Sequence, residues 1–202
     1  MKTLKQAVKK IKNLHVSMDQ LTSSYNRVRR ELWAMGLLVA DSPLDEVGCY
    51  LEPLWTLDGL SGLGMTMGLY YPKSTASGDG NIHVPAICPA EILGYERRVL
   101  VDVLRHEYAH ALEDNYEQFV HVRAFSKAFG AEYGETVVFK EGTEENYVTL
   151  YAQTKTQEDF ADTFMCYMKY KGKLPAKWSD NRAIRAKWSF IDDLRAKIYD
   201  QL

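Results

Sequence analysis

Two histidines and a glutamate form the most informative pattern in this sequence of 202 residues. The segment LRHEYAHAL contains His-Glu-x-x-His, in which one helical turn separates His106 from His110. Residues four apart lie on one helix face about 5–6 Å from each other, so two imidazoles can converge on one tetrahedral metal ion. Glu107 follows the first histidine, where its carboxylate can reach a water on that metal and act as general base.

A catalytic zinc site also needs a third protein ligand, and two acidic residues further along the chain are candidates. The segment QEDFADTF places Glu158 and Asp162 on one face of an expected helix, next to an apolar side. One carboxylate could bind the metal, while the other accepts a hydrogen bond from the distal nitrogen of a ligand histidine and fixes its tautomer. Asp159 is the main competitor for the role of ligand and ranks behind Glu158.

Together, RHEYAHAL and QEDFADTF resemble the gluzincin branch of the zincin metallopeptidases. The closest likeness is to the lethal-factor-like peptidases, the group of the anthrax lethal factor catalytic domain and the proline-specific endopeptidases. This likeness covers roughly residues 62–194 and is specific at the two motifs. It implies that His106, His110 and Glu158 bind Zn²⁺ and that Asp162 supports a ligand histidine.

The same group of peptidases has a tyrosine seven residues before its glutamate ligand, and Tyr151 occupies that position here. The resemblance implies that the Tyr151 hydroxyl donates a hydrogen bond to the oxyanion or protonates the leaving amine. A phenol beside a polarised carbonyl is also a sensible electrophilic partner on chemical grounds. Because the chain has 13 tyrosines, packing of the Tyr151 ring against its neighbours is the competing interpretation.

Apolar periodicity predicts the elements that must position these residues. The expected order is helices, a small sheet and then helices, which is an α+β fold. We expect a zincin-like arrangement, in which a small mixed sheet has an edge strand beside the His-Glu-x-x-His helix and a mostly helical part follows. Pro85 favours an edge position for the second strand, since proline cannot donate to a ladder. Strands are expected at 63–71 and 81–87, and helices at 96–115, 117–129, 156–168 and 181–199.

The first part of the chain has an apolar stripe of its own, over residues 1–35. It fits either a single long helix or two helices that break near Val16, because Ser17 and Gln20 form a capping-box pattern. We therefore predict an N-terminal helical segment with a linker over residues 1–60 and a zincin-like catalytic domain over 61–202. The stripe is expected to pack on its own domain, although it could also pair with another chain.

Composition narrows the classes of protein. Hydrophobic residues make up 46% and charged residues 26%, as in a chain with a packed core. We expect no disulfide framework, because the three cysteines stand far apart. No apolar stretch reaches the roughly 20 residues of a membrane span and no signal peptide is recognised, so a cytoplasmic location without membrane association is expected, with secretion by a non-standard route as the alternative.

Charge is distributed unevenly. Residues 1–35 carry eight basic and two acidic side chains, and residues 169–202 carry nine and four, whereas the stretch between them is strongly acidic. Basic ends can bind nucleic acid. We expect solvated helix faces instead, because no nucleic-acid-binding motif accompanies the charge.

The sequence therefore predicts a zinc metalloendopeptidase whose partner is a peptide or protein substrate. By resemblance to other zincins, the substrate is expected to lie antiparallel to the edge strand at 81–87. His83 on that strand is interpreted as a surface or core histidine. The alternative function is a catalytically silent or regulatory protein that binds a partner through its N-terminal helices.

Overall fold

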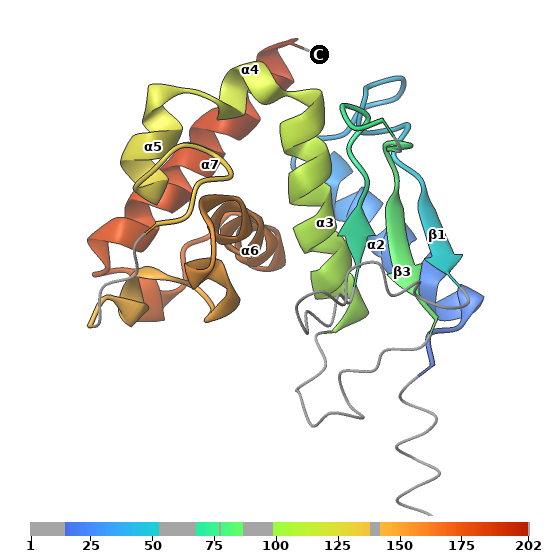
Figure 1. Ribbon diagram of the computed structural model, residues 1–202, viewed down its shortest axis with the longest axis horizontal. Coiled ribbons are helices and arrows are strands. Elements are labelled where there is room, and N and C mark those ends of the chain that lie inside the picture. The colour runs from blue at the N-terminus through green and yellow to red at the C-terminus, as the bar shows by residue number, and fades with distance from the viewer. Residues whose placement is uncertain (1–14, 53–67, 77, 87–98, 138–141, 202) are drawn as a thin grey trace, which may run out of the picture.

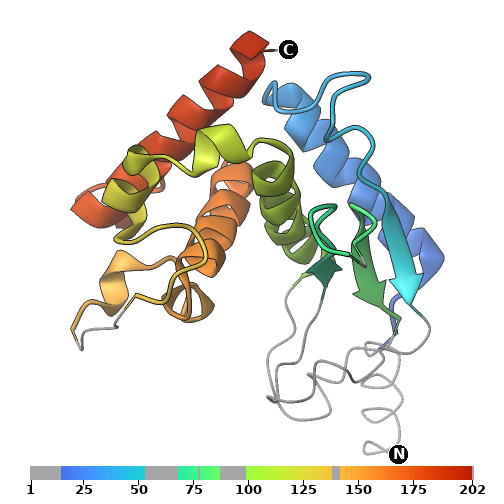
Figure 2. The ribbon, with the colours of Figure 1, turned by 45° about the horizontal axis from the view of Figure 1, so that its top comes forward.

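The computed structural model describes residues 15–52, 68–76, 78–86, 99–137 and 142–201 (Figure 1). Helix α3 (Leu100–Asn115) lies at the centre of this part of the chain, between a small sheet and helix α6 (Thr156–Lys169). Helices α3 and α6 run side by side in both views of the ribbon (Figure 2). The chain thus has the predicted mixed α+β character.

The sheet has three strands in the order β1-β3-β2, where β1 is Cys49–Glu52, β2 is Leu69–Tyr70 and β3 is Ile82–Pro85. Strands β1 and β3 pair in parallel, whereas β2 and β3 are antiparallel, so the predicted mixed sheet is confirmed. Strand β1 falls in the segment interpreted as a linker. Its four residues are too few for a clear alternating pattern.

The expected edge position of 81–87 is wrong within the described residues, because β3 lies between the two other strands. Pro85 is tolerated in this central strand for a geometric reason. The ladder to β1 uses the amides of Ile82 and Ala86, which donate to Gly48 and Glu52, respectively. Successive backbone N–H groups of a strand point to opposite sides, so the missing N–H of Pro85 is not one that faces β1.

Helix α3 is buried on almost all of its sides. Its apolar residues include Leu104, Tyr108 and Leu112, all fully buried, and its polar residues Arg105 and His106 are buried as well. An amphipathic surface helix would show one apolar stripe, whereas a helix with neighbours all round is apolar on most faces. Polar groups on such a helix need partners inside the protein.

Helix α2 (Met18–Ala34) packs against α3. It begins just after Val16, where the two-helix alternative for residues 1–35 placed a break. Ser17 and Gln20 form the complete capping box, with side-chain to backbone distances of 3.2 and 3.0 Å. Ser17 is extended, and Val16 before it lies outside the helix and donates its N–H to Ala86 at 2.8 Å. One continuous helix through Val16 is therefore wrong.

The predicted helix at 117–129 is two short helices, α4 (Glu117–Val120) and α5 (Arg123–Phe129). His121 leaves the helical conformation between them, and its ring contacts the Glu113 carboxylate at 2.6 Å. Gly130 follows the last residue of α5, which is also the end of the predicted range, and has a positive φ of 91° that glycine adopts without strain.

The remaining helices match the sequence closely. Helix α6 begins at Thr156 as predicted, and the last helix, α7 (Arg182–Gln201), begins one residue and ends two residues after the predicted 181–199. Short 3₁₀ turns lie between the helices: η3 (Glu144–Asn146), η4 (Tyr151–Gln153) and η5 (Ala176–Trp178). No helix among the described residues is long and apolar enough to cross a membrane.

Several predictions concern segments outside the described residues. They are 1–14 in the N-terminal stripe, 63–67 in the first strand, 87 in the second strand, 96–98 before the His-Glu-x-x-His helix, and 138–141. The expected helix start at 96 is wrong, because Val99 is an extended N-cap and α3 begins at Leu100. Cys88 also lies outside the described residues, whereas Cys49 and Cys166 are free thiols.

We expect the contact between α2 and α3 to make stability depend on pH. Burial alone would raise the pKa of Glu31, but its paired hydrogen bonds with Arg105, both 2.8 Å, lower it. A lowered folded-state pKa adds stability that is present at neutral pH and lost on acidification. Glu31→Gln should therefore lose about 2 kcal/mol of unfolding free energy at pH 7, and much less near pH 3.

Urea unfolding across this pH range measures the difference between the two proteins. Glu46→Gln is the matched control, because it removes only an exposed ion pair with Lys73 and should change stability by less than about 1 kcal/mol. A gap between wild type and Glu31→Gln that stays constant down to pH 3 would contradict the assignment.

Candidate metal centre

Three side chains from two helices converge in the interface between α3 and α6. His106 and His110 lie one turn apart on α3, and Glu158 lies in the first turn of α6. The two Nε2 atoms are 3.3 Å apart. The Oε2 atom of Glu158 is 3.1 Å from Nε2 of His106 and 3.8 Å from Nε2 of His110. This is the ligand set predicted from the sequence, and it could hold a metal ion.

The partners of His106 show which of its nitrogens faces the other ligands. Its Nδ1 atom lies 2.7 Å from Oδ1 of Asp162, a carboxylate that is fully buried. An ionised carboxylate accepts hydrogen bonds and donates none, so Nδ1 carries the hydrogen in this contact. In the neutral ring, the lone pair is then on Nε2 and points toward His110 and Glu158.

Glu158 supplies the test of whether a cation fits. Its Oε2 atom is buried, and no hydrogen-bond donor among the described residues satisfies it. The nearest cationic group is His106, whose Nε2 atom lies at an ion-pair distance of 3.1 Å. A buried, unsatisfied carboxylate oxygen is costly. Two imidazole nitrogens and one carboxylate oxygen suit a divalent metal ion, so the residues fit.

The electrostatics of the three ligands agree with this interpretation. Burial opposes a charge on His106, but contacts with Asp162 and Glu158 outweigh it and raise its pKa to about 10. Burial and the neighbouring His106 lower the pKa of His110 to about 4. Burial alone would raise the pKa of Glu158, but the two histidines lower it to about 2. Without a cation, His106 is therefore the protonated member of the cluster at neutral pH, and a metal bound at its Nε2 would displace that proton.

Tyr151 lies beside this cluster, on the 3₁₀ turn η4. Its ring centroid is 5.9 Å from that of His106, and 48% of the residue is exposed. Thr149 holds the turn in place, because its hydroxyl accepts from the Ala152 amide at 3.1 Å and donates to Asp162. The same carboxylate therefore contacts the ligand His106 and the segment that carries Tyr151.

Glu107 is buried and faces the sheet side of α3. Its Oε2 atom accepts a hydrogen bond of 3.0 Å from the backbone amide of Tyr70 in β2. A Cβ added to Gly68 would lie 2.7 Å from the Val103 side chain and 3.2 Å from Cγ of Glu107. Glycine at position 68 therefore leaves the space that the Glu107 side chain occupies.

Asp159, the alternative ligand, has a different partner. Its Oδ2 atom is 2.6 Å from Nζ of Lys187, a residue of α7 that is only 3% exposed. Thr163 also contacts this carboxylate, at 3.3 Å. Burial raises the pKa of Asp159 to about 6, although Lys187 opposes the rise. Asp159 thus ties α6 to α7, and Glu158 is the residue placed with the histidines.

Two residues of the site have no signal in the sequence. Tyr133 lies in the loop after α5, and its hydroxyl is 3.2 Å from Nδ1 of His110. Thr149, described above, lies just before η4. Neither residue belongs to a motif or to a periodic pattern, since both are on irregular segments whose course depends on tertiary packing.

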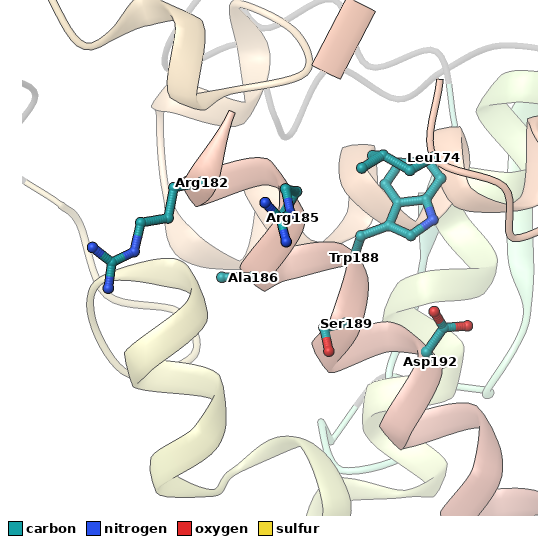
Figure 3. A pocket seen from close by; sticks show the side chains of 7 residues that line it. All are labelled: Leu174, Arg182, Arg185, Ala186, Trp188, Ser189 and Asp192. Carbon is teal, nitrogen blue, oxygen red and sulfur yellow. The ribbon is translucent and has the colours of Figure 1, made fainter. Parts of the chain in front are cut away.

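One pocket adjoins this centre, and another lies apart from it. One, of about 460 Å³, is bordered by Tyr133 and the start of α5, and so adjoins the residue that contacts His110. The other, of about 610 Å³, is lined mainly by residues of α7 and contains no residue of the predicted site (Figure 3). Its lining residues are Leu174, Arg182, Arg185, Ala186, Trp188, Ser189 and Asp192.

Comparison of the chain with protein families, with characterised proteins and with solved structures gave no match. The geometry of the site is therefore the basis for the functional argument.

The neighbouring carboxylates Glu158 and Asp159 should behave differently when each is neutralised. Glu158→Gln removes a ligand, so we expect divalent-metal binding to be lost in titration calorimetry. Asp159→Asn leaves the buried Lys187 without its countercharge, so it should cost about 3–5 kcal/mol of unfolding free energy. The variant should still bind metal at temperatures where it is folded. Metal binding that survives Glu158→Gln and is lost in Asp159→Asn would reverse the two assignments.

Proposed function

We propose that this protein is a zinc-dependent metallopeptidase. The observation that carries the proposal is the convergence of His106, His110 and Glu158, with a buried Glu158 oxygen that lacks a hydrogen-bond donor within the described residues. Three protein ligands leave a fourth tetrahedral position for water or substrate, which distinguishes catalytic from structural zinc sites. The resemblance of both motifs to lethal-factor-like peptidases supports peptide bonds as the substrate.

Bound zinc would act as a Lewis acid that polarises the scissile carbonyl and lowers the pKa of water. The protein's own residues fix the positions of the candidate ligands. His106 is held in one tautomer by Asp162, and His110 lies beside it on the same buried helix. These fixed positions mean that little reorganisation is needed when substrate binds.

Glu107 is assigned as the general base. It would take a proton from the attacking water and pass it to the leaving amine. Its position next to the first ligand histidine supports the role. The Tyr70 amide, which donates to Oε2, keeps the carboxylate oriented.

Tyr151 is assigned as the electrophilic partner. Its hydroxyl would donate a hydrogen bond to the oxygen of the scissile carbonyl as negative charge develops there. The exposure of Tyr151 and the proximity of its ring to His106 support this role, since a group that acts on substrate must be accessible.

The edge of the sheet nearest α3 is β2, so we assign the peptide to β2 instead of to 81–87. The amide of Tyr71 donates to Asn81 of the neighbouring chain segment at 3.0 Å. The amide of Tyr70 therefore points the other way, toward Glu107. An extended peptide beside this edge would pass close to the proposed base, while the Tyr70 amide stays bonded to Glu107.

Glu107→Gln is the variant that tests the proposed reaction. The amide oxygen of glutamine can still accept from Tyr70, so fold and zinc content should be kept, while cleavage should fall by about 10²–10⁴-fold because the base is gone. A peptide library read by mass spectrometry measures the loss, and metal analysis of the same samples verifies zinc. Glu113→Gln, on the same helix, should remain active. Wild-type protein that binds no zinc would instead favour partner binding without catalysis.

Tyr151→Phe removes only one hydroxyl. We expect kcat to fall by about 10²-fold with little change in KM, because the hydrogen bond forms chiefly in the transition state. Steady-state kinetics on a peptide found in the library separate the two parameters. Tyr170→Phe, at another exposed tyrosine, is the control. An unchanged kcat in Tyr151→Phe would leave this tyrosine with a packing role only.

A further inference from the structure

His110 has a neutral partner where His106 has a charged one. Nδ1 of His106 meets the Asp162 carboxylate at 2.7 Å, whereas Nδ1 of His110 meets the Tyr133 hydroxyl at 3.2 Å. Both contacts occupy the nitrogen that faces away from the ligand cluster. Each histidine therefore has an outer partner from a different segment of the chain.

The direction of the second contact follows from the cluster itself. Nε2 of His110 lies 3.3 Å from Nε2 of His106 and 3.8 Å from the carboxylate of Glu158. A metal ligand needs its lone pair on that nitrogen, which places the hydrogen of the neutral ring on Nδ1. Nδ1–H then donates to the phenol oxygen of Tyr133. A phenol can accept this bond without adding a charge to the buried site.

The loop that carries Tyr133 is attached to the helix that carries Glu158. Thr156, the first residue of α6, is buried, and its hydroxyl contacts the carbonyls of Glu132 at 2.6 Å and Glu135 at 3.2 Å. Its backbone amide also donates to Glu135 at 3.0 Å. Tyr133 lies between these two anchored carbonyls. Its position is thus fixed relative to the first turn of α6.

Aromatic contacts fix the ring as well. The Tyr133 ring stacks on His121 with centroids 5.3 Å apart and meets Phe125 and Phe160 edge-on at 5.5 and 6.1 Å. The ring also borders the cavity of about 460 Å³ at the start of α5. Replacement by phenylalanine keeps all of these ring contacts and removes only the hydroxyl.

We propose that Tyr133 is a positioning residue for the metal: it sets the tautomer and ring orientation of His110 and couples that ligand to the helix carrying Glu158. The proposal rests on the metal site of the proposed function and adds a residue to it. The contribution of such an outer partner to metal affinity is typically 10–100-fold. The contribution of a neutral phenol to metal affinity should be near the lower limit of this range, about tenfold.

The test compares the full-length wild type with Tyr133→Phe and Tyr116→Phe. Tyr116 is the matched control, since its buried hydroxyl has no hydrogen-bond partner among the described residues. Competition with a chromophoric chelator measures the dissociation constant for Zn²⁺. The visible absorption of the Co²⁺-loaded proteins reports ligand geometry. Thermal unfolding with and without Zn²⁺ gives the stabilisation caused by the metal.

For Tyr133→Phe we expect a zinc dissociation constant about tenfold higher, an altered Co²⁺ spectrum and a smaller zinc-induced rise in unfolding temperature. Tyr116→Phe should match wild type in all three. A purely structural role of Tyr133 would lower the unfolding temperature equally with and without zinc and leave affinity and spectrum unchanged, which would overturn the proposal. Wild-type protein that binds no zinc, or that binds it equally well as Glu158→Gln, would overturn the proposed function too.

Discussion

Burial of helix α3 on nearly all sides is the constraint on which the rest of the site depends. A polar group inside the protein must find a partner or cost free energy, and the polar residues of α3 meet this requirement one by one. Glu107 accepts from a strand amide, and His106 and His110 each use Nδ1 for an outer partner. What remains are three atoms that face one another: two Nε2 atoms and one oxygen of Glu158. A single divalent cation would satisfy all three at once.

The surroundings of the cluster divide into rigid and accessible parts. The candidate ligands lie on two long helices in direct contact, whose positions are set by packing over many residues. Tyr151, by contrast, lies on a short exposed turn, which Thr149 connects to Asp162. Groups that hold a metal benefit from a fixed geometry, whereas a group that meets substrate must be reached from solvent. The Asp162 carboxylate connects both parts, because it contacts His106 as well as Thr149.

Features that depend on local spacing could be predicted from the sequence alone. The one-turn separation of His106 and His110 places them on one face of any helix, and Glu158 and Asp162 have the same separation on α6. The capping box at Ser17 likewise involves only residues within one turn. These patterns predicted the candidate ligands, an acidic partner for one of the two histidines, most helix boundaries and the α+β class.

Only the tertiary structure decided which residues meet across the chain. Strand β3 is central because β1, a segment with no clear pattern, pairs with it from more than 30 residues away. Asp159, the competing ligand candidate, is paired instead with Lys187 on α7. The contact of Tyr133 with His110 also forms between distant segments. Such pairings arise from burial and packing between elements that are distant in the sequence, so the local spacing of residues does not predict them.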